Sequence, residues 1–164
     1  MQLRPLPLRC GSARRTVAPM GGNPYWYVVD YEEPLQSALD KLREREFEAG
    51  RYNPVMPFPM EDRNATPGKK HDSIKAALKA SDADGTRSIL DIVRISDEPD
   101  FCEAAPFDLE ELRSILGTTR PTAEQVVASI SRLLEPVVRG MALYVIAFEG
   151  ERPAKVLFLG YSFD

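Results

Sequence analysis

The segment LREREFEAGRYNP, residues 42–54, brings acidic, basic and aromatic residues together in a way that could form a binding site. Glu46, Arg51 and Tyr52 lie close to one another within it, and folding could bring Arg87 to the same place. The planar guanidinium group of arginine suits carboxylate and phosphate groups. These residues therefore predict a charge-paired pocket for an anionic ligand.

Glu46 continues a helical face that is otherwise formed by Leu35, Leu39 and Leu42. A carboxylate on such an apolar face is costly to bury without a partner. Two interpretations stay open from the sequence. Either Glu46 is buried and paired with an arginine, or the helix frays before Gly50 and Glu46 reaches water.

His71 and Asp91 complete the set of candidate ligand-binding residues. His71 is the only histidine and stands in GKKHDSI, where an exposed loop ahead of a helix is expected rather than a general base. Its acidic and hydroxyl neighbours in sequence do not make a hydrolytic triad, because triads are assembled in space. Asp91 alternates with Ile89 and Val93, so in a strand its carboxylate would face inward and could serve as a site acid.

The stretch SDADGTRSILDI, residues 81–92, looks like half of a calcium-binding loop. With Gly85 in the sixth position of such a loop, Ala80 would take the first ligand position and Arg87 the eighth. Alanine supplies no side-chain oxygen, and a cation at the eighth position is equally unsuitable. The stretch predicts a tight turn whose Asp and Gly residues support turn geometry.

Familiar catalytic motifs are missing from the sequence: it has no glycine-rich phosphate loop, nucleophile elbow, metal-binding histidine pair or kinase signature. Cys10 and Cys102 lack the spacing of a zinc site. We therefore expect neither a metal nor a cofactor. The sequence favours a non-catalytic protein without excluding an enzyme.

Hydrophobic periodicity and turn residues predict the elements that would position these side chains. In the first half we expect a strand at 25–31, a helix at 33–49, a long irregular loop at 51–70, a short helix at 73–80 and a strand at 88–96. In the second half we expect a helix at 108–117, a long helix from 122 that Pro136 ends or kinks, and a hairpin of strands 141–149 and 154–163.

Several helix ends carry recognisable capping residues. Gly50 and Gly117 are expected C-terminal stops, and Asp72 or Ser73 an N-cap. At two further helix N-termini, an N-cap residue whose side chain accepts hydrogen bonds is followed three residues later by Glu or Gln: Asp108 with Glu111, and Thr122 with Gln125. At the first of these, Phe107 can also pack on Leu112. The apolar stripe that follows Thr122 is expected to face the core and consists of Ala123, Val126, Val127, Ile130, Leu133, Leu134 and Val137.

The predicted fold class is α+β, with about four strands in a mixed or antiparallel sheet and about four helices packed largely on one face. Residues 20–164 are expected to form a single domain. Residues 1–19 are rich in proline and arginine and are expected to be a disordered leader or upstream extension, with Met20 as the natural start.

Charge is distributed unevenly along the chain. The leader carries +4 and no acidic residue, and because the whole chain carries −4, residues 20–164 carry −8. An acidic body argues against nucleic acid as a partner and is compatible with a basic protein partner or simply with solubility. No apolar run approaches the roughly 20 residues of a membrane span. Two cysteines in the chain fit a reduced, cytoplasmic setting.

Four stretches resemble those of small acidic bacterial cytosolic proteins of no known function. They are YWYVVDY, ALDKLREREFEAGRYNPV, DADGTRSILDIVRISDEPDF and LFLGYSFD, and the resemblance covers most of residues 24–164. It implies no activity, cofactor or site residue that can be carried over. It does favour Met20 as the start, because the leader has no counterpart.

Three functions remain open at this point. The first is a non-catalytic bacterial cytosolic interaction protein, in one version an immunity-type protein that neutralises a basic toxin through an acidic surface. The second is an anionic-ligand-binding protein or enzyme with a pocket near Glu46, Arg51 and Arg87. The third is a module that forms oligomers through the edge of the final hairpin. The sequence does not predict an oligomeric state.

Overall fold

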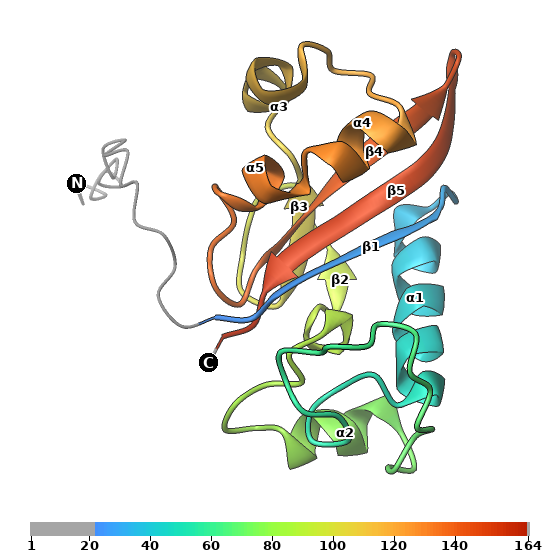
Figure 1. The fold of residues 1–164 in the computed structure, drawn as a ribbon, viewed down its shortest axis with the longest axis vertical. Helices are drawn as coiled ribbons and strands as arrows, with labels where there is room; N and C mark the ends of the chain where they lie inside the picture. Colours follow the sequence, from blue (N-terminus) through green and yellow to red (C-terminus); the bar gives the residue numbers. More distant parts are fainter. Residues whose placement is uncertain (1–21, 164) are drawn as a thin grey trace, which may run out of the picture.

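A five-stranded mixed sheet is the framework of the structure, a computed structural model that describes residues 22–163 (Figure 1). The sheet order is β1-β5-β4-β3-β2. Strands β1, β5 and β4 are antiparallel neighbours, whereas β3 runs parallel to β4 and β2 parallel to β3. The strands are β1 (Pro24–Asp30), β2 (Arg94–Ile95), β3 (Glu103–Pro106), β4 (Ala142–Glu149) and β5 (Arg152–Tyr161). The α+β class is confirmed, with β3 as a strand that the sequence did not predict.

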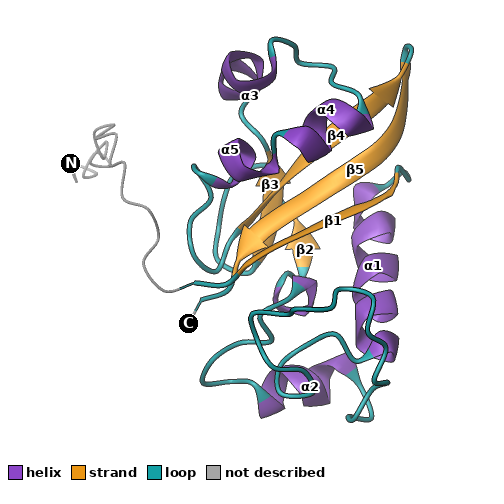
Figure 2. Ribbon diagram, in the orientation of Figure 1, coloured by secondary structure: helices purple, strands orange, loops and turns teal. Residues whose placement is uncertain are grey.

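Helices cover both faces of the sheet, so the prediction that they pack largely on one face is wrong. The helices are α1 (Leu35–Ala49), α2 (Ile74–Ala80), the 3-10 turn η1 (Ile89–Asp91), α3 (Leu109–Leu116), α4 (Ala123–Ala128) and α5 (Ile130–Leu134). Figure 2 shows α4 and α5 lying over β4 and β5, with α1 beside β1. The reason is that β1, β4 and β5 carry apolar side chains on both faces, and each face needs its own cover.

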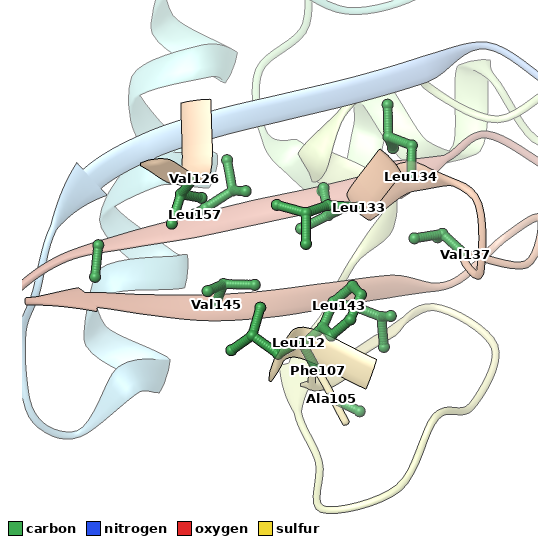
Figure 3. Packing of buried hydrophobic residues seen from close by; sticks show 12 residues of the cluster. Ala105, Phe107, Leu112, Val126, Leu133, Leu134, Val137, Leu143, Val145 and Leu157 are labelled. Atoms are coloured by element: carbon green, nitrogen blue, oxygen red, sulfur yellow. The ribbon is translucent and has the colours of Figure 1, made fainter. Parts of the chain in front are cut away.

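The two faces of the sheet form two separate cores. On one face, α1 and η1 pack over β1 and β5, where Leu39, Leu42 and Phe158 are almost completely buried. On the other face, α3, α4 and α5 pack over β4 and β5. Their side chains meet those of the sheet in Figure 3, where Leu133 and Val145 are among the labelled residues. Burial of each large side chain stabilises the fold by about 1.5–3 kcal/mol.

The predicted capping residues act as expected. Ser73 accepts a hydrogen bond from Ala76 N, and Asp108 accepts one from Glu111 N. Thr122 and Gln125 form the complete reciprocal capping box. Gly50 ends α1 and Gly117 ends α3, both in the left-handed conformation. Local sequence signals therefore placed these helix ends correctly.

The predicted strand at 88–96 is wrong for most of its length. Ser88 accepts a hydrogen bond from Leu90 N, and Thr86 N donates to the Asp91 carboxylate at 2.9 Å. These local bonds wind Ile89–Asp91 into η1, and only Arg94–Ile95 form a strand. The turn predicted just before it is present, with Gly85 at φ +71°.

The long helix predicted after Thr122 is broken at Ser129 into α4 and α5. Ser129 N donates to Val126 O, which is an i→i−3 bond, and Ser129 has non-helical backbone angles. The break turns α5 so that Leu133 and Leu134 face the sheet, whereas Val127 is left 44% exposed. Val127 is therefore not the core residue that the stripe predicted.

The final hairpin is present as predicted, but its edges are not the edges of the sheet. β5 lies between β1 and β4, and β4 pairs with β3 at Ala142–Tyr144. The outer strands of the described sheet are β1 and β2. Oligomerisation through the edge of the hairpin thus loses its structural basis.

Gly160→Ala tests how tightly β1 packs on β5. Gly160 pairs with Tyr25, and a Cβ at this position would lie 2.5 Å from the Tyr25 hydroxyl oxygen. We expect the free energy of unfolding, measured by chemical denaturation, to fall by about 3 kcal/mol through overpacking. Gly117→Ala is the control, because no atom lies within 4 Å of its Cβ and only the φ of +76° is strained, at about 1 kcal/mol. Equal losses for the two variants would contradict the packing argument.

Candidate functional site

Glu46 is buried and paired, so the interpretation in which it reaches water is wrong. The side chain is 2% exposed at the end of α1. Arg51 donates hydrogen bonds to both carboxylate oxygens of Glu46: its Nε lies 2.7 Å from Oε2, and its Nη2 lies 2.9 Å from Oε1. Arg45 Nε donates a further hydrogen bond to Oε1, at 2.9 Å. The hydrogen bond to Glu46 raises the pKa of the Arg51 guanidinium above its ordinary value. Arg51 Nη1 also donates to Ala65 O at 3.4 Å, which ties the long loop to the end of α1.

Tyr52 and His71 form a second contact, which fastens the two ends of the same loop. The Tyr52 side chain is fully buried and stacks on Phe47, with ring centroids 5.7 Å apart. Its hydroxyl lies 2.9 Å from His71 Nδ1 and accepts a hydrogen bond from Lys70 N at 3.3 Å. This pair holds the loop between α1 and α2 against a small core that includes Phe47 and Leu90.

Arg87 and Asp91 lie in the turn that leads into η1. Asp91 is 4% exposed and receives the hydrogen bond from Thr86 N. Arg87 is half-buried with φ +54°, in the left-handed region that non-glycine residues rarely adopt. Burial first, and then the charge of Asp91, raise the pKa values of Tyr25 and Cys102. A raised pKa keeps the Cys102 thiol protonated, which makes it a weak nucleophile.

The six predicted site residues do not line one cavity. Glu46 and Arg51 contribute to a partly open space of about 170 Å³, which we call the β1 cavity, bounded by β1, the end of α1 and the long loop. Tyr52, His71, Arg87 and Asp91 are not among its lining residues. Residues that the sequence did not suggest take their place, including Tyr27 and Arg63.

A larger hollow lies on the other side of the sheet, at the end of β3 and the start of α3. We call this hollow, of about 660 Å³, the acidic groove. Its carboxylates are Asp97, Glu98, Asp108 and Glu111. Its apolar side chains are Pro99, Pro106, Phe107, Leu109, Pro136, Val137, Val138, Met141 and Leu143. None of the described residues that line it is basic.

The acidic groove lies directly over core residues, and some of its apolar side chains are exposed to water. Phe107 and Val137, each 3% exposed, belong to the core beneath α3, α4 and α5 and form the floor. Leu109 and Val138 stand beside them, 60% and 58% exposed. The acidic groove therefore presents exposed apolar side chains next to carboxylates.

Sequence reasoning missed the acidic groove, although a signal for it was present. Residues 97–111 contain seven acidic residues and no basic residue. This short stretch therefore accounts for most of the −8 carried by residues 20–164. The sequence identified Asp108 and Glu111 as capping residues of a helix. That local role did not indicate that both residues also belong to a charged surface.

Residues 22–163 contain neither a metal-binding cluster nor a membrane-spanning helix. No group of three or more His, Cys, Asp or Glu side chains in this range is arranged to hold a metal ion. No helix of the same range combines the length and apolar character needed to cross a membrane.

Comparison with known proteins gives no match: no family model fits this sequence, and neither curated proteins nor solved structures show a significant similarity.

Arg51→Ala tests whether the Glu46 pair is structural. We expect the free energy of unfolding to fall by about 3–5 kcal/mol, because the variant leaves a buried carboxylate without its main partner. Arg45→Ala is the matched control: it contacts the same carboxylate, but its side chain is 50% exposed, so we expect a loss below about 1 kcal/mol. Urea denaturation measures both. Similar small losses in both variants would show that Glu46 does not depend on Arg51.

Proposed function

We propose that this protein is a non-catalytic interaction protein that binds a lysine- or arginine-rich segment of a partner protein in the acidic groove. The observation that carries the proposal is the combination of four carboxylates with the exposed Leu109 and Val138 in one hollow. Each half of this combination selects a feature of the partner. The carboxylates select cations, and the apolar side chains select aliphatic or proline side chains placed between them.

The size of the acidic groove indicates what kind of partner surface fits. A volume of about 660 Å³ lies within the roughly 300–1,000 Å³ of pockets that take a drug-sized ligand. That space accommodates a short linear segment with a few side chains rather than the face of a folded domain. The remainder of a folded partner would contact the acidic surface around the groove, including Asp100 and Glu110.

Electrostatics supports a role in fast and selective association. Acidic groups concentrated on one surface accelerate encounters with a basic partner and make the association rate depend on salt. An immunity-type protein that neutralises a basic toxin in the bacterial cytoplasm is the version of this function that we favour. The acidic character of residues 20–164 supports it.

A peptide titration tests the proposal. The full chain is titrated with a fluorescently labelled twelve-residue peptide of alternating lysine with leucine or proline, and with a matched peptide in which glutamate replaces lysine. We expect saturable binding of the basic peptide alone. Glu98→Gln with Glu111→Gln should weaken it about fivefold, since each exposed charge contributes roughly 0.2–1 kcal/mol.

The control removes the same charge elsewhere. Asp82→Asn with Asp84→Asn also deletes two exposed carboxylates, in the turn after α2 and away from the acidic groove, and should leave binding unchanged. Val138→Ala should mainly raise the dissociation rate, because it removes apolar contact without changing charge. Equal binding of the acidic peptide, or equal effects of the two double variants, would refute the groove as the site.

A further inference from the structure

The β1 cavity has an excess of positive charge, although a carboxylate lines it. Arg51 holds both oxygens of Glu46 and Arg45 holds one of them, so this carboxylate is already neutralised. Arg63 lines the cavity as a second guanidinium. The ionised groups of the lining thus sum to +1, and an anion entering the cavity would meet one cation that no carboxylate of the lining neutralises.

Arg63 is held at the cavity while most of its donors remain available. Its Nη2 donates to Trp26 O at 2.7 Å, and its guanidinium carbon lies 4.0 Å from the centre of the Trp26 ring. The backbone bond uses one of the five N–H donors of a guanidinium, and stacking on the indole uses none of them. The side chain is therefore positioned in advance to bind an anion with two donors at once.

Tyr27 adds a hydrogen-bond donor to the same lining. Burial first, and then the charge of Glu46, raise the pKa of its phenol far above the ordinary value. The phenol therefore stays protonated at neutral pH. A protonated phenol can donate to a carboxylate oxygen.

The size and walls of the β1 cavity indicate which anions it would accept. About 170 Å³ is the space of roughly five or six waters at ~30 Å³ each, which is too small for a nucleotide. The rest of the wall is formed by Asn23 and by the mostly apolar side chains of Pro24, Tyr25, Phe58, Pro59 and Met60. Such walls favour a ligand with an apolar body over a bare inorganic anion.

We infer that the β1 cavity binds a small carboxylate with an aromatic or short aliphatic body, and that Arg63 and Tyr27 hold the carboxylate. This site lies on β1, at the opposite edge of the sheet from the acidic groove beside β3. It is independent of the proposed partner binding, and it uses different residues from the Arg87, His71 and Asp91 that the sequence suggested.

Trp26 provides a built-in reporter for this inference, because it is the only tryptophan in the chain and Arg63 stacks on it. The full chain is titrated with benzoate while Trp26 fluorescence is followed. Benzamide serves as the neutral ligand of the same shape, and inorganic phosphate as the anion without an apolar body. We expect a saturable change with benzoate, with a dissociation constant of about 1 mM or below, and at least tenfold weaker binding of the other two.

Arg63→Gln should weaken benzoate binding at least tenfold, as judged from the dissociation constant rather than from the fluorescence amplitude. Arg120→Gln is the matched control, since Arg120 is also exposed and also stacks on an aromatic ring, that of Phe148 at 4.7 Å, but does not line the β1 cavity. Circular dichroism verifies that both variants fold. Absence of a saturable benzoate response, equal binding of benzamide, or equal effects of the two variants would each overturn the inference.

Discussion

The structure depends on the two-sided burial of the β4–β5 hairpin. Its side chains alternate between two faces, and both faces are apolar, so neither can be left in water. One face takes α1 and η1 as its cover, and the other takes α3, α4 and α5. β1 extends the sheet next to β5, and β3 with β2 extends it next to β4. The positions of both candidate binding sites follow from this arrangement, because each lies beside a strand that extends the hairpin.

The buried Glu46–Arg51 pair stabilises the end of α1 and the long loop that follows it. A carboxylate on an apolar helix face is unfavourable alone, but it becomes an anchor once a guanidinium satisfies both of its oxygens. Through Arg51 the pair reaches Ala65, and the neighbouring contact of Tyr52 with His71 fastens the far end of the same loop. The loop is thereby held beside β1, where Phe58, Pro59, Met60 and Arg63 line the β1 cavity.

The linings of the two candidate sites differ in the sign of their charge. The acidic residues of 97–111 gather around β3 and the start of α3, whereas two guanidinium groups face the β1 cavity at the opposite edge. Each site combines its charge with apolar side chains that remain accessible. This combination is suited to recognition, because charge selects and orients the ligand while apolar contact contributes to the lifetime of the complex. The two sites therefore suit ligands of opposite sign.

The sequence by itself determined the features that depend on neighbouring residues: the capped helix ends at Ser73, Asp108 and Thr122, the stops at Gly50 and Gly117, and the final hairpin. It also marked Glu46 as an unusual carboxylate on an apolar helix face, with pairing to an arginine as one of two open interpretations. These signals are encoded within a few positions by hydrogen-bonding capacity and side-chain alternation.

The tertiary structure decided the rest. β3 is short and contains alanine, and it becomes a strand only because β4 and β2 pair with it. Most of the strand predicted at residues 88–96 does not form, because local hydrogen bonds around Asp91 wind the chain into a turn. Which charged groups share a cavity also depends on how the long loop folds back on β1, so sequence proximity could not reveal Arg63 as a neighbour of Glu46 or unite the residues of the acidic groove.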